Sequence, residues 1–417
     1  LEITDWVFEI DNKSITHRPD LWGHRGIAAE LSAIYQRPLE PLDVGLPSLG
    51  GGAGYPVRIE DAACRRYLGL VIEGARPEMS PQWLQNLLLS VKQRPIDLLV
   101  DLSDFVLLDL GQPNHTFDAD ALEGAPVVVR KASSGESIST LDGELRALTD
   151  DDLLICADRK PVALAGIMGG EGSKVEAGTR RLLLEVASFE ATTVRRTSSR
   201  LGLRTDSSAR FEKSLTPTLP AEAAGHFARL LQAEQPEVSF PCALTDVGDW
   251  QDPACTLSLR PQRVRSALGE ALTDAIQIDI LQRLGFGVQA ADGVLQVTVP
   301  SARASKDIGI EQDLVEEVGR IYRYGNIPEQ ALVEEVRPPH PSRRRALVRK
   351  LQDRLAGVGH FRETLGYSFV SDDMLGKLGR LDVPHVQVSN PVDSQQSRIR
   401  RDLVPSLLTG LETNLRH

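Results

Sequence analysis

The spacing of apolar and polar residues predicts how the N-terminal part of the chain is organised. In HRGIAAELSAIYQRP, which starts at His24, the apolar residues recur at helical spacing, and Pro38 ends the predicted helix. The preceding sequence, LEITDWVFEID, is expected to be extended. The Gly-, Pro- and Ser-rich residues 41–56 follow as a linker. We therefore expect a domain boundary near residues 45–56, with residues 1–45 as the remnant of an N-terminal α/β domain.

Residues 57–240 combine helical and strand-like runs. A helix is predicted from Pro81 through LQNLLLSVKQR. Four short apolar runs predict strands: FVLLDL (105–110), VVVRKA (127–132), LLICAD (153–158) and RLLLEVASF (181–189). The mixed order of these elements favours one α+β or α/β domain over a repeat array.

The remaining residues predict two further domains. Residues 256–330 read as two helices, a hairpin that turns at Asp292-Gly293, and an acidic helix, which together resemble a winged-helix domain. A basic, Pro-rich hinge begins at Arg337, and residues 337–417 read as an α/β segment that ends inside a helix. The predicted fold class is therefore α+β multidomain.

Composition and charge narrow the classes of protein. The 417 residues suggest about three domains. Lys and Arg number 47 against 58 Asp and Glu, and the net charge of -11 argues against a protein that coats nucleic acid non-specifically. No apolar run reaches membrane-spanning length. The four cysteines lack CxxC spacing, which argues against a zinc ribbon or a disulfide framework, so we expect a reducing cytoplasm.

One basic cluster stands out in this acidic chain. The segment VRRTSSRLGLRTDSSAR (194–210) interleaves arginines with seryl and threonyl hydroxyls, a composition typical of phosphate binding. Surface ion pairs are the alternative use of these arginines. The arginines of the basic hinge (343–345 and 349) form a weaker cluster of the same kind.

The acidic helix KDIGIEQDLVEEVGRIY is a candidate metal site. Its apolar residues form a stripe that starts at Ile310, and Asp313, Glu316 and Glu317 are expected together on the other face. Asp307 stands near the helix start and completes an oxygen-rich set suited to Mg²⁺. The alternative is the solvated face of an amphipathic helix.

Two further side chains are candidates for chemistry. Glu185 interrupts the apolar strand RLLLEVASF, where a buried carboxylate needs hydrogen-bond donors or a raised pKa, unless that face is wet. His115 is expected in a loop after a strand, in GQPNHTFDAD, and can exchange a proton near neutral pH or be purely structural. The glycines of GIMGGEGSK match no nucleotide-binding motif, and neither GxSxG nor HExxH occurs.

Several ordered motifs together resemble one family. They are THRPDLWGHRGIAAEL, RPIDLLVDLSDFVLLDLGQPNHTFDADAL, AGIMGGEGS, LLLEVASF, GLRTDSSARFEK and KDIGIEQDLVEEVGRIYRYGNIP. Over nearly its whole length the chain resembles the β subunits of bacterial phenylalanine–tRNA ligases. The resemblance implies an α2β2 heterotetramer that binds tRNA(Phe) and uses ATP at the aminoacylation site of the α subunit, with no membrane or DNA partner. It also implies that the β subunit hydrolyses mischarged Tyr-tRNA(Phe).

The resemblance also assigns residues and domains. Residues 57–240 become the editing domain, residues 256–330 the winged-helix-like domain with the acidic helix, and residues 337–417 a truncated class II catalytic-like module without its own catalysis. The implied residues are, for editing, His115, Glu185 and Thr205; for the substrate, Ser103, Asp104, Ala165, Gly166, Asp206 and Ser207; for tRNA phosphates, Arg195, Arg196, Arg200 and Arg204; and for Mg²⁺ shared with the α subunit, Asp307, Asp313, Glu316 and Glu317.

Some features depart from the family pattern. Ser103-Asp104 stands where Thr-Asn is common, and Ser207 stands where some relatives have Ala, so the pocket is expected to be altered and more polar. The N-terminal tRNA-binding and C-terminal anticodon-binding domains have no counterpart, which predicts a core fragment. Two other functions stay open at this point: a stand-alone tRNA deacylase, and a structural tRNA-binding scaffold without a ligase partner.

Overall fold

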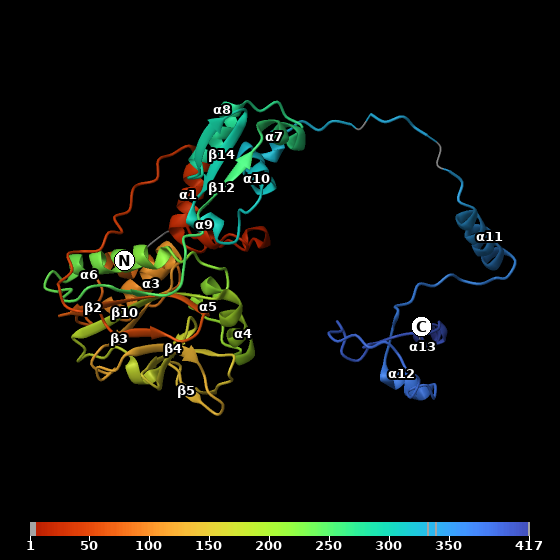
Figure 1. Cartoon of the computed structure of the whole chain (residues 1–417). Coiled ribbons are helices and arrows are strands. Elements are labelled where there is room, and N and C mark those ends of the chain that lie inside the picture. Colours follow the sequence, from red (N-terminus) through yellow and green to blue (C-terminus); the bar gives the residue numbers. More distant parts are fainter. Residues whose placement is uncertain (1–5, 332, 338–339, 416–417) are drawn as a thin grey trace. The chain divides into compact units, whose positions relative to one another are not determined.

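The computed structural model describes residues 6–331, 333–337 and 340–415. It is a mixed α/β structure with several small sheets, divided into one unit up to residue 329 and another from residue 330 (Figure 1). The first five residues of the expected extended stretch, the Pro338-Pro339 step of the hinge, and the end of the predicted final helix at His417 lie outside the described residues.

The N-terminal segment contains the predicted helix. Two 3-10 turns, η1 (Lys13–Ile15) and η2 (Pro19–Trp22), precede α1 (His24–Tyr35). The helix ends at Gln36, whose left-handed backbone (φ 53°) lets its N–H bond to the Ser32 carbonyl, a common way to stop a helix before a proline.

Two sheets and a helical layer build the central block, residues 57–247. The four-stranded sheet has the order β11-β2-β10-β3, with β11 (Thr245–Val247), β2 (Cys64–Glu73), β10 (Arg181–Phe189) and β3 (His115–Asp118). The five-stranded sheet has the order β1-β4-β7-β8-β9, with β1 (Val57–Ile59), β4 (Val127–Lys131), β7 (Leu153–Ala157), β8 (Lys160–Leu164) and β9 (Met168–Gly169). The strands predicted at 127–132, 153–158 and 181–189 are confirmed.

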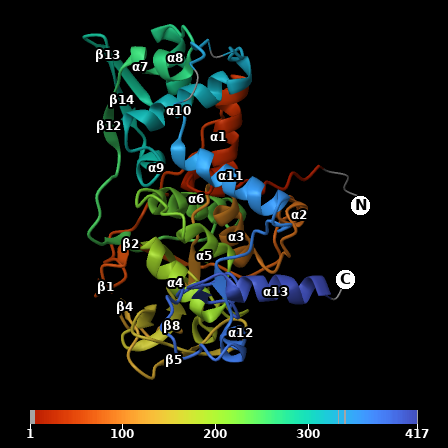
Figure 2. The ribbon, with the colours of Figure 1, turned by 90° about the vertical axis from the view of Figure 1, so that its right-hand side faces the viewer.

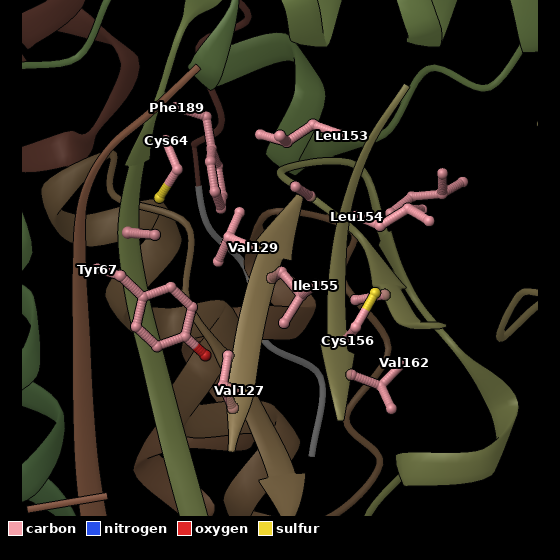
Figure 3. Packing of buried hydrophobic residues seen from close by; sticks show 14 of the residues in the cluster. Cys64, Tyr67, Val127, Val129, Leu153, Leu154, Ile155, Cys156, Val162 and Phe189 are labelled. Atoms are coloured by element: carbon pink, nitrogen blue, oxygen red, sulfur yellow. The ribbon is translucent and has the colours of Figure 1, made fainter. Parts of the chain in front are cut away.

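Apolar side chains fill both faces of the four-stranded sheet. On one face they pack against α2 (Gln82–Ser90), α3 (Leu98–Leu110) and α6 (Leu219–Glu234), and on the other against the five-stranded sheet. Figure 1 shows α3 and α6 on one side of β2 and β10, and β4 on the other. Figure 3 shows this second layer, where Tyr67 of β2 lies near Val127 and Val129 of β4. Strand β10 is therefore buried on both faces, which explains its continuous apolar run.

The strand predicted at 105–110 is wrong, because FVLLDL is the second half of helix α3. Asp97 caps this helix by accepting hydrogen bonds from the N–H groups of Leu99 and Val100, and Gly111 ends it in a left-handed conformation (φ 78°). A short apolar run shows neither helical nor strand periodicity, so the capping residues at its ends are what indicate a helix. His115 consequently follows a helix and opens strand β3, where a loop after a strand was expected.

Smaller elements complete the central block. They are β5 (Ser137–Ser139), β6 (Leu145–Ala147), η3 (Glu171–Ser173), α4 (Ala191–Leu201) and α5 (Asp206–Phe211).

The third block contains a three-stranded sheet covered by helices. Its elements are β12 (Cys255–Leu259), α7 (Pro261–Leu268), α8 (Asp274–Arg283), β13 (Gly287–Ala291), β14 (Val294–Val299), α9 (Ser301–Ala304), α10 (Glu311–Tyr322) and η4 (Tyr324–Asn326). The helices and the hairpin appear in the predicted order. Asp292 and Gly293 both have positive φ, at 50° and 77°, as a two-residue hairpin turn requires.

The second unit has few strands. Its elements are α11 (Arg343–Gly357), β15 (Phe369–Val370), α12 (Asp372–Lys377), β16 (Arg398–Ile399) and α13 (Val404–Leu415). The basic part of the expected hinge is helical, because Ser342 caps α11 and the arginines from residue 343 form its first turn. In the part of the chain that the structure describes, no helix is long and apolar enough to cross a membrane.

Candidate functional site

A pocket in the central block is lined by residues of both of its sheets and of α5. It encloses about 420 Å³ of empty space, its open mouth included. Most of the residues that line it are apolar, and polar side chains reach it from four positions, Asn114, His115, Glu185 and Ser207. The residues that line it are Pro113, Asn114, His115, Ile155, Ala163, Leu164, Gly166, Ile167, Met168, Gly169, Glu185, Ser207 and Phe211. An apolar pocket with a few convergent polar groups is the usual form of a small-ligand site.

Strand pairing places Glu185 and His115 side by side. Glu185 of β10 lies directly opposite His115 of β3, so both side chains leave the sheet on the same face. On its other side Glu185 lies opposite Gly69 of β2, which has no side chain to occupy that position. The face also carries Leu183 and Ala187, which pack toward the five-stranded sheet. The alternation of β10 thus aims one carboxyl group into an apolar wall.

Glu185 is a buried acid without a partner. Its exposed fraction is 6%, and its carboxyl group has no hydrogen-bond partner or ion pair among the described residues. Burial raises the pKa of Glu185 to about 8, because the apolar surroundings disfavour the charged form. At neutral pH the group is therefore mainly protonated, able to donate one hydrogen bond and to accept another. The wet-face alternative for this residue is wrong.

His115 presents an unpaired ring nitrogen. Its Nε2 is buried and has no hydrogen-bond partner among the described residues. The ring packs edge-to-face on Phe117, with centroids 4.5 Å apart, and Gly169 lies so close that a Cβ there would meet Nε2 at 2.9 Å. Burial lowers the pKa of His115 to about 4, so the imidazole is neutral near pH 7. A neutral ring can accept a proton or orient a water molecule.

The other predicted editing residues lie around this pair with different roles. Ser207 lines the pocket and donates to the Gly166 carbonyl (3.0 Å). Thr205 does not line it: its hydroxyl caps α5 and donates to the Ile167 carbonyl (2.8 Å). Asp206 is mostly exposed and pairs with Arg210.

The backbone at Ala165 and Gly166 offers one free amide. The N–H of Ala165 donates to the Leu153 carbonyl (3.0 Å), so this group is not available to a ligand. The N–H of Gly166 has no backbone partner among the described residues, and Gly166 itself lines the pocket. Its φ of 70° and the close side chains of Phe211 and Phe189 restrict this position to glycine.

Neither Ser103 nor Asp104 lines the pocket. Any effect of these two residues on a substrate in the pocket therefore passes through their neighbours. Ser103 of α3 donates to Oδ1 of Asn114 (2.5 Å), and Nδ2 of Asn114 donates back to the Ser103 carbonyl (3.1 Å). This reciprocal pair ties α3 to the residue before His115. Burial, with the nearby Asp101, raises the pKa of Asp104 to about 6.

The predicted phosphate-binding arginines divide into two pairs. Arg195 and Arg196 are exposed on α4 and have no ion-pair partner among the described residues. Arg200 pairs with the buried Asp152, and Arg204 pairs with Glu212 (2.8 Å). The first two arginines are therefore the ones free to contact a polyanion.

The four predicted Mg²⁺ ligands are not gathered into one site. Asp307 and Glu317 both pair with Arg303, and Asp313 accepts from the N–H groups before α10. Glu317 is buried (4% exposed) whereas Glu316 is exposed, so the carboxyl groups of α10 do not converge although they lie at i, i+3 and i+4 on the helix. Residue 317 borders the apolar stripe of the helix, and its carboxylate is buried there in an ion pair with Arg303. Among the described residues, no group of three or more His, Cys, Asp or Glu side chains could hold a metal ion.

Several pocket residues escaped the sequence reasoning. Pro113, Asn114, Met168 and Gly169 all line the pocket. Pro113 and Asn114 precede His115 in the same motif, and Met168 and Gly169 belong to AGIMGGEGS. Their place in motifs that resemble the family was the one sequence feature that could have indicated them. Ile155 and Ala163 come from the second sheet, and only the packing of the two sheets brings them to the pocket.

Comparisons with known proteins match the whole chain to one kind of protein. Family models match in order: the B3/4 domain at residues 63–234, the tRNA synthetase B5 domain at residues 257–324, and the phenylalanyl tRNA synthetase β chain CLM domain at residues 327–417. The phenylalanine–tRNA ligase β subunit of Solibacter usitatus is 38% identical over 99% of this chain and 54% of its own length. That of Oleidesulfovibrio alaskensis is 38% identical over 100% of this chain and 52% of its own length.

A solved N-terminal fragment of the phenylalanyl-tRNA synthetase β subunit from Pyrococcus horikoshii matches 75% of this chain and 86% of that one, with a TM-score of 0.39 and 16% identity, too distant to support a conclusion by itself. The chain spans about half the length of the curated relatives it matches. The assignment rests on the sequence identity over the full chain and on the three domain matches in order. Over its whole length the chain is thus a homologue of part of the phenylalanine–tRNA ligase β subunits.

Proposed function

We propose that the central-block pocket hydrolyses the ester of Tyr-tRNA(Phe), within a β subunit that assembles with an α subunit into a cytoplasmic α2β2 phenylalanine–tRNA ligase. The observation that carries the proposal is the position of Glu185 directly opposite His115 on one face of β10 and β3, where both line the pocket. Among the described residues, neither the Glu185 carboxyl group nor Nε2 of His115 has a hydrogen-bond partner. A stand-alone deacylase is not favoured, because the relatives are ligase β subunits.

Editing is needed because a pocket for Phe cannot strongly exclude Tyr. Adding a hydroxyl to an isostere gives only about hundredfold discrimination in an apolar site. A second site that binds the tyrosine hydroxyl by a hydrogen bond can select Tyr-tRNA(Phe) for hydrolysis, since Phe would leave the buried polar group of that site unpaired. Glu185 supplies that group: its protonated carboxyl can accept from the phenol hydroxyl and donate to the phenol oxygen.

The ester is already activated, so hydrolysis needs a positioned water and a place for the developing negative charge. Nε2 of the neutral His115 orients the water and takes its proton as the oxygen adds to the carbonyl carbon. The N–H of Gly166 faces the resulting oxyanion. Collapse of the intermediate breaks the bond to the ribose oxygen, which receives the proton, and releases tyrosine.

The other parts of the chain have supporting roles in this proposal. Arg195 and Arg196 contact tRNA phosphates beside the pocket. The third block is a winged-helix-like domain, and residues 337–417 form part of a class II catalytic-like module that packs on the α subunit and has no catalysis of its own. ATP is used at the α subunit.

Two variants of His115 test the proposal. In the assembled αβ enzyme, His115→Ala should slow the deacylation of Tyr-tRNA(Phe) by roughly a hundredfold or more. His115→Gln places an amide near the position of Nε2, which can orient water but not take its proton, so it should recover only part of the rate. Deacylation at the wild-type rate by His115→Ala would remove this pocket from the reaction.

A further inference from the structure

Two buried arginines and a partly buried one gather at the junction of the N-terminal segment with the third block. Arg18 precedes η2, Arg303 lies on α9 and Arg320 on α10, and their side chains are 6%, 4% and 25% exposed. Four carboxylates surround them, and we call the seven residues the arginine–carboxylate cluster. The carboxylates are Asp20, Glu30, Asp307 and Glu317.

The contacts of this cluster join distant parts of the sequence. Glu30 of α1 accepts from Arg320 of α10, 290 residues away (Nη2 to Oε2, 3.2 Å), and from Arg18 (3.1 Å). Arg18 also approaches Asp307 (Nε to Oδ2, 3.4 Å). Nearby, Arg283 of α8 donates to the Ala33 carbonyl of α1 (2.5 Å). Both views of the chain place α1 beside the third block (Figure 1, Figure 2).

Asp307 and Glu317 are committed to guanidinium groups. Glu317 accepts from Arg320 (Nε to Oε1, 2.6 Å) and pairs with Arg303 (Nη2 to Oε2, 2.8 Å). Asp307 accepts from Arg303 and also faces His17 (3.2 Å). Mg²⁺ requires near-octahedral oxygen ligands at about 2.0–2.1 Å. A dication here would have to displace buried arginines and would stand among their positive charges.

The other two predicted ligands point elsewhere. Asp313 Oδ2 accepts from the N–H groups of Gly309 and Ile310 (2.8 and 2.9 Å), which fixes it at the start of α10. Glu316 is exposed and has no ion pair among the described residues. The four carboxylates therefore do not fit a shared magnesium ion in this chain.

We propose that Asp307 and Glu317 are counter-ions of an ionic clamp that fixes the N-terminal segment 17–35 on the third block, and that they do not bind Mg²⁺. The same segment contacts the central block. Arg210 of α5 donates to the Trp22 carbonyl (3.0 Å), and His24 Nδ1 bonds the Leu108 carbonyl of α3 (2.9 Å). The clamped segment thus bridges the third block and helices α3 and α5 of the central block, and α5 lines the pocket.

Substitutions of two glutamates distinguish an ionic clamp from a metal site. Glu30 belongs to the clamp but was never a candidate metal ligand, whereas Glu316 is a candidate ligand outside the clamp. Glu30→Gln, Glu316→Gln and Glu317→Gln would be compared in thermal unfolding of the full chain, alone and assembled with the α subunit. Each form would be measured after EDTA treatment, with added MgCl₂ or with NaCl of equal ionic strength.

If the clamp exists, Glu30→Gln and Glu317→Gln should lower the unfolding midpoint by on the order of 5 °C, because each removes a counter-ion from two of the arginines of the cluster. Glu316→Gln should leave it unchanged, and Mg²⁺ should act no differently from NaCl. If Glu317→Gln fails to fold, Glu30→Gln carries the test. The proposal is overturned if Glu30→Gln leaves the midpoint unchanged, or if Mg²⁺ specifically raises it in the wild type but not in Glu316→Gln.

Discussion

The recognition of tyrosine should depend on the hydrogen bonds of Glu185 and not on its charge. Burial raises the pKa of this carboxyl to about 8, so at pH 7 it is mainly a neutral acid with one donor and one acceptor. Glutamine has the same shape and also combines an acceptor with a donor. Glu185→Gln should therefore keep most of the preference for Tyr over Phe at pH 7, and Glu185→Ala should abolish it.

The magnitude follows from the cost of an unmade hydrogen bond. Leaving a buried polar group unpaired costs about 1–3 kcal/mol, and each 1.36 kcal/mol is a factor of ten. The Tyr/Phe ratio of kcat/KM should thus fall by roughly 5- to 150-fold in Glu185→Ala and by only a few-fold in Glu185→Gln. Above about pH 8 the wild-type carboxyl ionises and becomes a stronger acceptor, so its ratio should rise, while that of Glu185→Gln should not.

The assay is deacylation of purified Tyr-tRNA(Phe) and Phe-tRNA(Phe) by the αβ enzyme from about pH 6 to pH 9, with the spontaneous hydrolysis at each pH subtracted. An Ala variant that keeps its Tyr preference would refute the recognition role. A Gln variant as unselective as the Ala variant at pH 7 would show that the ionised carboxylate is required, against the reasoning from burial.

Three further outcomes follow from single positions. Thr205→Val removes the hydroxyl that caps α5 and binds the Ile167 carbonyl, so denaturant unfolding should show a loss of about 1 kcal/mol; an unchanged midpoint would contradict this. Gly225→Ala should lower the thermal midpoint although alanine favours helices, because its Cβ would overlap the Val44 carbonyl; a raised midpoint would refute that packing. Unfolded Glu185 loses its proton near pH 4.5 and folded Glu185 near pH 8, so wild-type stability relative to Glu185→Gln should decline between these pH values, whereas a constant difference would contradict the raised pKa.

Strand β10 and helix α3 show how far apolar patterns predict the fold. The run RLLLEVASF was recognisable as a strand because it is short and rich in large apolar residues, and its burial on both faces explains the missing alternation. The run FVLLDL looks the same locally, but it continues a helix that begins after Asp97. Reading the cap at Asp97 together with Gly111 would have predicted this helix.

The pocket and the ion pairs differ in how visible they are in the sequence. Glu185 was noticeable as a charge inside an apolar strand, and His115 through its motif, but their pairing depends on the register between β10 and β3. The arginine–carboxylate cluster joins Arg18 and Glu30 to Arg320 across almost 300 residues. Residue types and spacing cannot indicate which of several carboxylates will meet an arginine, so the acidic helix suggested a metal site instead.

The most direct test of the central claim is the ratio of the deacylation rates of Tyr-tRNA(Phe) and Phe-tRNA(Phe) by the wild-type αβ enzyme at pH 7. The pocket geometry predicts that the tyrosyl ester is hydrolysed at least about fivefold faster, because only tyrosine pairs with the buried Glu185. Equal rates for the two esters, or no hydrolysis above the spontaneous rate, would contradict the assignment of the pocket.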